Sequence, residues 1–444
     1  MLKRKVHGTL MGITTSPSSS CLRTVRFRGA VAAAVVAAGS LLSSASAQQS
    51  AGRGSGGTKS SGNIVLLSQA KQLIQQGDAE GALTLLQQAD MHGAHAGEVH
   101  ALRGTCQAVL QRPVESATEF DEAIALQPHS APLYYSSGLA LASFNNLDRA
   151  LERLATAVKL EPSLPGARYH YALVLARAGK FDESERQTEL EMANPHAAEP
   201  ALDLWRLKAR DFYNQKKWQE TIDAYRKVLE LDSDNPEAYG AMGEALYSLN
   251  RTAESKTALE RAELLDPENG TTHHLLGKLY QDAGQQDQAI AELETSIRLQ
   301  PDDQEGMYRL LRIYARKGDA ANKSRLQADL QNLIAARNRE AQGEAKATLL
   351  NDAGVNLEKN GDLAGALGDF DQAATLDPSN LIFQRNAALL LCKLGRPEEA
   401  IRRLRDILST DPDDAETLQI LAVAREVTAG SSTQIALTPA KATH

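Results

Sequence analysis

The sequence predicts an all-α protein that is built from tandem helical hairpins. Proline residues recur 34 positions apart, each at the end of a helical pattern, and small residues recur in register with them. The composition is 42% hydrophobic but only 5% aromatic, which suits packed helices better than a large β core. The proline pairs are Pro128 and Pro162, Pro267 and Pro301, and Pro378 and Pro412.

The first element along the chain is a leader. Residues 1–47 contain six basic and no acidic side chains, then an apolar stretch and the sequence ASA, which is typical of a secretory signal peptide cut before Gln48. The apolar stretch is too short for a membrane anchor. A mitochondrial-type leader is the alternative, because the segment is also rich in Arg and Ser. We expect export to the periplasm or the extracellular space.

Charge and cysteine content exclude several classes of protein. Loss of the leader changes the net charge from −8 to −14, which argues against nonspecific binding to nucleic acid or anionic lipid. Only Cys106 and Cys392 then remain, far apart, so the chain is no disulfide scaffold or metal ribbon. Both fall inside predicted helices, where we expect them to be small buried hydrophobes.

Each repeat unit is predicted to contain two amphipathic helices. When Pro301 is numbered position 32, the helices cover positions 1–14 and 18–31, with a turn signal between them. Positions 8 and 20 are mostly small, so the two helices can approach closely, and position 24 is mostly large. Position 27 is alanine in five units and is expected to be covered by the next unit: Ala89, Ala123, Ala157, Ala262 and Ala373.

Ten units follow one another, starting at residues 63, 97, 131, 165, 202, 236, 270, 304, 347 and 381. Three extra residues after the fourth unit and nine before the ninth divide the array into blocks at 63–198 (four units), 202–337 (four units) and 347–428 (two units and a capping helix). The flanks 48–62 and 429–444 are low in complexity and are expected to be disordered.

The pattern resembles the tetratricopeptide repeat of exported bacterial proteins. The unit from Leu202 carries Trp205, Ala209, Phe212 and Tyr225 at the consensus positions, and the unit from Gly270 carries Leu276, Gly277, Tyr280, Ala289, Leu293 and Pro301. The resemblance implies a right-handed α-solenoid whose terminal helix is a solvating cap.

Two units depart from the consensus. The fourth has Thr188 and Glu191 at packing positions, so its packing should be loosest, and the eighth has Leu311 and Lys323 where small residues are expected.

The resemblance also implies that positions 2, 5, 9 and 12 of each first helix line a concave groove. We predict that partners bind there, and the basic side chains favour acidic peptides. The alternative is that these charges are merely solvated. The family's clamp for C-terminal carboxylates is absent, so its ligand is not implied. The predicted contacts are Tyr135, Tyr169, Arg206, Arg210, Tyr213, His274, Lys278, Tyr308 and Arg312, with Leu139 and Leu173 beside the first two.

No pattern of catalytic residues is present, so the predicted function is a non-catalytic scaffold for protein or peptide partners in the cell envelope, without cofactor or metal. The alternatives are an accessory subunit of a polysaccharide or protein export machine in the periplasm, and an enzyme with catalytic residues in the groove. Three motifs are only weak evidence for a chemical site. They are the histidines of MHGAHAGEVH (His92, His95 and His100) as metal ligands, GRGSGGTKS as a phosphate-binding loop, and the pair His273 and His274 as a catalytic dyad.

Overall fold

The computed structural model describes residues 59–89, 96–194, 200–410 and 414–428. The predicted leader, most of the 48–62 linker, the C-terminal tail, His92 and His95 lie outside these ranges. The described residues form helices and no strand, which confirms the all-α prediction. Residues 59–62, expected in the linker, instead form the first turn of a helix.

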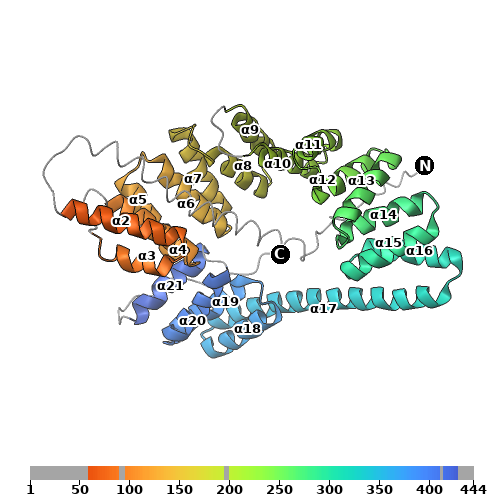
Figure 1. Cartoon of the computed structure of the whole chain (residues 1–444). Coiled ribbons are helices and arrows are strands. Elements are labelled where there is room, and N and C mark those ends of the chain that lie inside the picture. Colours follow the sequence, from red (N-terminus) through yellow and green to blue (C-terminus); the bar gives the residue numbers. More distant parts are fainter. Residues whose placement is uncertain (1–58, 90–95, 195–199, 411–413, 429–444) are drawn as a thin grey trace, which may run out of the picture.

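The described helices pair in chain order into ten hairpins, two of which share the long helix α17, and one terminal helix (Figure 1). They are α2 (Lys59–Gln75), α3 (Ala79–Leu86), α4 (Ala96–Val109), α5 (Pro113–Leu126), α6 (Ala131–Ser143), α7 (Leu147–Leu160), α8 (Ala167–Arg177), α9 (Phe181–Met192), α10 (Ala201–Asn214), α11 (Trp218–Leu231), α12 (Pro236–Ser248), α13 (Thr252–Leu265), α14 (Gly270–Asp282), α15 (Gln286–Leu299), α16 (Gln304–Lys317), α17 (Ala320–Lys359), α18 (Leu363–Leu376), α19 (Leu381–Lys393), α20 (Pro397–Thr410) and α21 (Ala415–Thr428).

Close approach of the two helices in each hairpin depends on the small residues at positions 8 and 20. A Cβ atom at Gly243 would lie 2.5 Å from Cγ of Leu259, which is fully buried. Serine at position 20 also donates to the position 8 carbonyl, as Ser255 Oγ does to Gly243 O at 2.7 Å. The same bond joins position 20 to position 8 in the second and fourth units. The position 27 alanines are all buried, as predicted.

The turn inside every hairpin has the same backbone geometry. Position 15 has a positive φ in all ten units, which reverses the chain after the first helix. Glycine occupies position 15 in six units. In the other four units a residue with a side chain adopts this left-handed backbone conformation, which is strained for such residues. Those four residues are Gln111, Asn145, Lys216 and Asn250.

The junction between the eighth and ninth units differs from the expected pair of helices. Residues 320–359 form the single 40-residue helix α17, which supplies the second helix of one unit and the first of the next. The nine extra residues continue the helix because the stretch is rich in Ala, Arg, Glu and Gln and contains no proline. Residues 335–342 are all exposed, so neither neighbouring hairpin covers the middle of α17.

Thr188 and Glu191, the polar residues at packing positions of the fourth unit, are both buried. Thr188 is fully buried and donates to the Ser184 carbonyl at 2.9 Å. Glu191 is 2% exposed and lies 3.8 Å from Nε of Arg168. The structure therefore provides these polar groups with partners.

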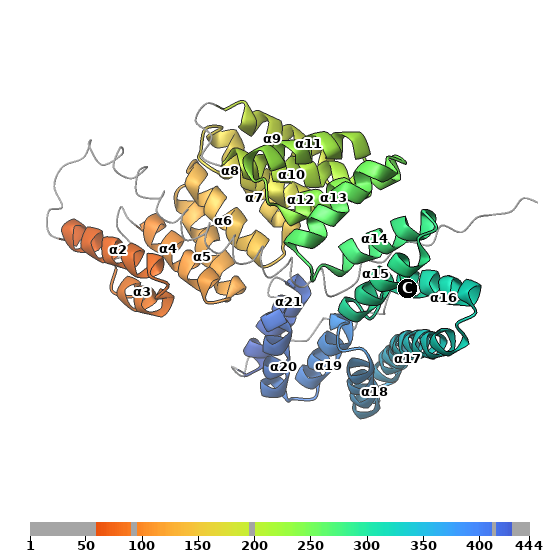
Figure 2. The same ribbon diagram turned by 45° about the vertical axis from the view of Figure 1, so that its right-hand side comes forward.

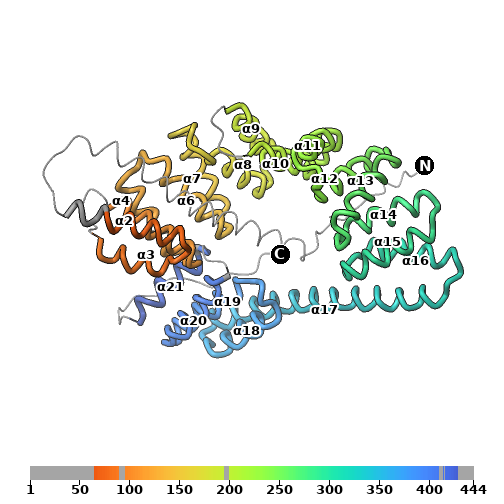
Figure 3. The backbone as a smooth tube through the Cα atoms, viewed as in Figure 1, coloured from red at the N-terminus to blue at the C-terminus, as the bar shows by residue number. Residues whose placement is uncertain are grey.

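The hairpins stack into a curved row from α2 to α16, and α17 then runs back to α18–α21 (Figures 1 and 2). The continuous tube in Figure 3 traces this path through the long helix. The last helix, α21, buries Ile420, Leu421 and Ala424 against the preceding hairpin, as a cap does. In the described part of the chain, no helix has both the length and the apolar character needed to cross a bilayer.

Candidate partner-binding surface

The inner face of the array is formed by the first helices. First helices of consecutive hairpins contact one another directly, for example α4 with α6, α12 with α14, and α14 with α16. Second helices make no comparable contacts with each other in the described residues, so the stack is closer together on the first-helix side. Side chains at positions 5, 9 and 12 of these helices are therefore candidates for a shared binding surface.

The N-terminal part of this surface is less open than predicted. Tyr135 and Leu139 are 4% and 0% exposed and belong to the hydrophobic core around α6 and α7. The hydroxyl oxygen of Tyr135 lies 3.0 Å from Nδ1 of His170 on α8. The sequence pattern placed Tyr135 on the groove wall, but packing of α8 against α6 covers it. Tyr169 and Leu173 remain partly exposed.

In α10 the predicted basic residues already have acidic partners. Arg210 makes a bidentate pair with Glu237 on α12, with Nε and Nη2 at 2.7 and 2.9 Å from the two carboxylate oxygens. This hydrogen bonding raises the pKa of Arg210. Arg206 lies 3.5 Å from Asp232, and the Tyr213 hydroxyl donates to Glu244. Arg210 and Tyr213 thus connect α10 to the next repeat, whereas Asp232, the partner of Arg206, belongs to the same repeat.

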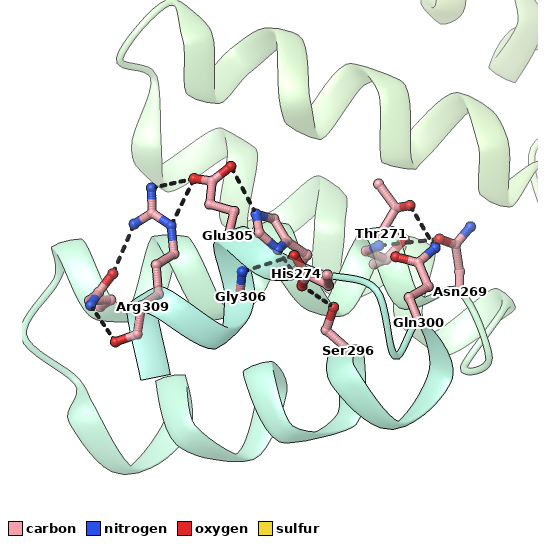
Figure 4. Close-up of polar contacts among 11 residues, drawn as sticks. Asn269, Thr271, His274, Ser296, Gln300, Glu305, Gly306 and Arg309 are labelled. Carbon is pink, nitrogen blue, oxygen red and sulfur yellow. Dashed lines mark hydrogen bonds and ion pairs between the residues drawn. The ribbon is translucent and has the colours of Figure 1, made fainter. Parts of the chain in front are cut away.

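A second polar network joins α14 to α16 (Figure 4). His274 Nδ1 lies 2.7 Å from Asp303 Oδ2, and its Nε2 lies 3.7 Å from Glu305. Glu305 also accepts two bonds from Arg309, at 2.9 and 2.8 Å. Burial alone would raise the pKa of Asp303, but its bond with His274 and further donors lower it overall. The His274 side chain is therefore held by the next repeat.

Lys278, the other predicted contact on α14, lies over an aromatic ring. Its Nζ is 4.5 Å from the ring centroid of Tyr247 on α12, a cation–π contact between neighbouring first helices. Like the pairs of Arg210 and His274, this contact joins one repeat to the next.

Tyr308 and Arg312 differ from the other predicted contacts. Tyr308 is 48% exposed and Arg312 is exposed, and neither hydrogen-bonds nor forms an ion pair with another described residue. Three other predicted contacts, Arg210, Tyr213 and His274, meet partners 27 to 31 positions later, on or just before the next first helix. After α16 the continuous helix α17 displaces the next hairpin, so these two side chains face solvent.

The acidic partners were not anticipated from the sequence. The only signal in the sequence is an acid slightly less than one repeat after a basic groove residue, as with Arg210 and Glu237. The two cysteines are buried as predicted, and burial raises the pKa of Cys106 to about 12 and that of Cys392 to about 11. Neither thiol is therefore ionised near neutral pH.

Comparisons with known proteins agree with the repeat pattern. Family models described as tetratricopeptide repeat match residues 64–88, 135–202, 236–269, 274–322 and 357–423, and one described as TPR repeat matches 209–250. Together they cover more than half of the chain.

Two relatives resemble long stretches of the sequence. "Protein CTR9 homolog" of Arabidopsis thaliana is 23% identical over 312 residues, which are 68% of this chain and 28% of that protein. "Cellulose synthase operon protein C" of Escherichia coli K12 is 26% identical over 287 residues, which are 58% of this chain and 22% of that protein. The chain thus spans less than a third of either relative.

Among solved structures, YrrB, a "TPR protein with an unusual peptide-binding site", is 21% identical, with a TM-score of 0.37. The match covers 43% of this chain and 97% of YrrB.

Proposed function

The chain belongs to the tetratricopeptide repeat family, and from this premise we propose that it is a non-catalytic scaffold that binds protein or peptide partners on the inner face of its solenoid. Surfaces of this kind bind extended or helical segments through side chains that successive repeats supply. The observation that carries the proposal is the pair Tyr308 and Arg312 at the inner face of α16, which are exposed and have no hydrogen-bond or ion-pair partner among the described residues.

We place the main contact region at α16 and not along the whole groove. Arg206, Arg210 and His274 are engaged by acids of the array, so a ligand would have to displace those acids before pairing with them. Arg312 needs no such displacement, and Tyr308 offers a ring with a polar tip. An acidic segment that also carries an apolar side chain matches this pair.

Peptide selection tests this placement. Random peptides displayed on phage are selected on the mature chain, and affinities of the best binders are measured by fluorescence anisotropy. The combined change Tyr308→Ala and Arg312→Glu is expected to weaken binding at least about tenfold, because it removes the ring and reverses the charge. The salt dependence of the remaining binding should also become smaller.

Lys227→Glu is the matched control, since Lys227 is exposed on the second helix α11 and, among the described residues, pairs with Glu230 on the same helix. It should leave affinity within about twofold of the parent value. Equal affinity of the α16 variant and the parent would contradict the proposed placement.

Export is part of the proposal and is supported by the basic and apolar pattern of residues 1–47. When the full chain is expressed in a bacterium, the product recovered from the periplasm should begin at Gln48, as read by N-terminal sequencing. A control chain that lacks residues 1–47 should stay in the cytoplasm. Recovery of the full chain only in the cytoplasmic fraction, with Met1 retained, would count against export.

A second candidate function is an accessory subunit of a polysaccharide or protein export machine. The similarity to "Cellulose synthase operon protein C" supports this candidate. Crosslinking of the exported chain in the cell envelope, followed by mass spectrometry, distinguishes the two functions. Synthase or secretion components crosslinked to α16 would favour the accessory subunit. Unrelated soluble proteins crosslinked there would favour the general scaffold.

A further inference from the structure

Three helices of the sixth and seventh units bring metal-ligating side chains together on the array. Glu263 on α13, His273 on α14 and Glu292 on α15 each place one ligand atom within 4.8 Å of the others. Nδ1 of His273 is 2.7 Å from Glu292 Oε2 and 4.0 Å from Glu263 Oε1. The His273 side chain is 7% exposed, so its position is fixed by packing.

The second nitrogen of His273 determines which atom faces the carboxylates. Nε2 lies 2.9 Å from the carbonyl oxygen of Pro267, and a carbonyl can only accept, so Nε2 carries a hydrogen. In the neutral ring, Nδ1 therefore carries no hydrogen, and its lone pair is directed at two carboxylates. That arrangement is repulsive unless a cation or a proton lies between the three atoms. A histidine that donates one N–H to a backbone carbonyl is also oriented as metal-binding histidines are.

No other positive group neutralises the two carboxylates. Within the ranges that the structure describes, neither Glu263 nor Glu292 forms an ion pair with lysine or arginine. Other acids of the array do have such a partner, as Glu237 has Arg210 and Glu358 has Lys393. The excess negative charge is therefore local to this cluster.

We propose that Glu263, His273 and Glu292 form a binding site for one divalent transition-metal ion of the Zn²⁺ type. One imidazole and two carboxylates are a ligand set that such ions accept, and water would complete the coordination shell. Ligand atoms about 2.1 Å from an ion stand about 3.0 to 3.4 Å apart. The present separations bracket these values, and rotation of the partly exposed Glu263 and Glu292 side chains is enough to reach them.

The neighbouring His274 shows why the cluster is distinctive. Its two carboxylates, Asp303 and Glu305, lie on opposite ring nitrogens, so one ion cannot bind both and the ring. His100 has the same arrangement, with Glu119 at Nδ1 and Glu122 at Nε2. Only at His273 do both carboxylates converge on one nitrogen in the described residues.

A bound ion would join α13 of one repeat to α14 and α15 of the next. Because the cluster is separate from Tyr308 and Arg312, this proposal does not depend on the proposed partner binding. It predicts that the ion stabilises the stacking of two consecutive repeats.

Zinc titration of the tag-free mature chain at about pH 8 tests the site, with isothermal titration calorimetry and thermal unfolding as readouts. One Zn²⁺ per chain is expected, with an upward shift of the unfolding temperature. His273→Gln should weaken this binding at least about tenfold, whereas His274→Gln should leave it within about twofold.

Glu263→Gln is the second variant and tests whether a folding defect explains the result. Glu263 is about one-third exposed and its replacement relieves carboxylate repulsion, so it should not lower the metal-free melting temperature. It too should weaken zinc binding at least about tenfold. Equal zinc affinity of the parent chain, His273→Gln and Glu263→Gln would overturn the proposal, as would the absence of zinc binding by the parent chain. In the latter case a proton alone bridges the three groups.

Discussion

Replacement of Gly243 by valine is expected to lower the free energy of unfolding of its repeat by about 3 kcal/mol. The new Cβ would lie 2.5 Å from Cγ and 2.6 Å from Cδ2 of Leu259, which is fully buried and cannot move into solvent. The helices α12 and α13 would have to separate, and this would also break the hydrogen bond from Ser255 to the Gly243 carbonyl.

Gly240→Ala in the same helix is the matched control. Its nearest neighbour would be Thr272 Oγ1 at 3.8 Å, an ordinary contact, so better helix propensity should stabilise the chain by up to about 1 kcal/mol. Because repeats unfold semi-independently, hydrogen exchange of α12 and α13 is the measurement, supported by urea unfolding. Unaltered exchange in the valine variant would mean that the hairpin does not depend on this close approach.

Replacement of Asp211 by asparagine is expected to stabilise the protein at neutral pH by up to about 4 kcal/mol. Asp211 is fully buried in α10, at a position that is apolar in most other units. Both carboxylate oxygens are buried without a hydrogen-bond partner among the described residues. Burial raises the pKa of the carboxyl to about 7, the nearby Ser184 opposes this rise, and the charge of Glu185 adds to it. The carboxyl is therefore protonated more readily in the folded chain than in the unfolded chain.

The sign of the pH dependence follows from that difference. An acid with a raised folded pKa contributes no penalty below the unfolded value of 3.8, and its penalty grows as pH rises toward about 7. The advantage of Asp211→Asn should therefore be small near pH 4 and largest above pH 7. Urea unfolding at both pH values measures it, with Glu220→Gln, at an exposed site on α11, as the control. An advantage that does not change with pH would show that the Asp211 charge is not the cause.

Much of the fold could be predicted because each repeat is a local unit. The 34-residue period, the small residues at positions 8 and 20 and the alanines at position 27 specify hairpins that bury their apolar faces against the next hairpin. The structure has all ten, and the residues chosen for packing, such as Ala123 and Leu259, are buried. The nine extra residues before the ninth unit were also recognised, but not the continuous helix that they form in α17.

The candidate surface was predictable only in part, because exposure of a groove position depends on its neighbours in space. Tyr135 and Tyr308 occupy the same position of their units, yet α8 covers the first and no following hairpin covers the second. The partners of Arg210 and His274 likewise belong to the next repeat, so they became evident only once the repeats were stacked.

The sequence by itself determined the repeat, its helices and its hydrophobic contacts, since these arise between residues less than about one period apart. Only the tertiary structure decided which polar side chains remain free and that Glu263, His273 and Glu292 converge. The reason is physical: the free energy of a charged group depends on the charges and solvent around it in three dimensions, and helix stacking sets both.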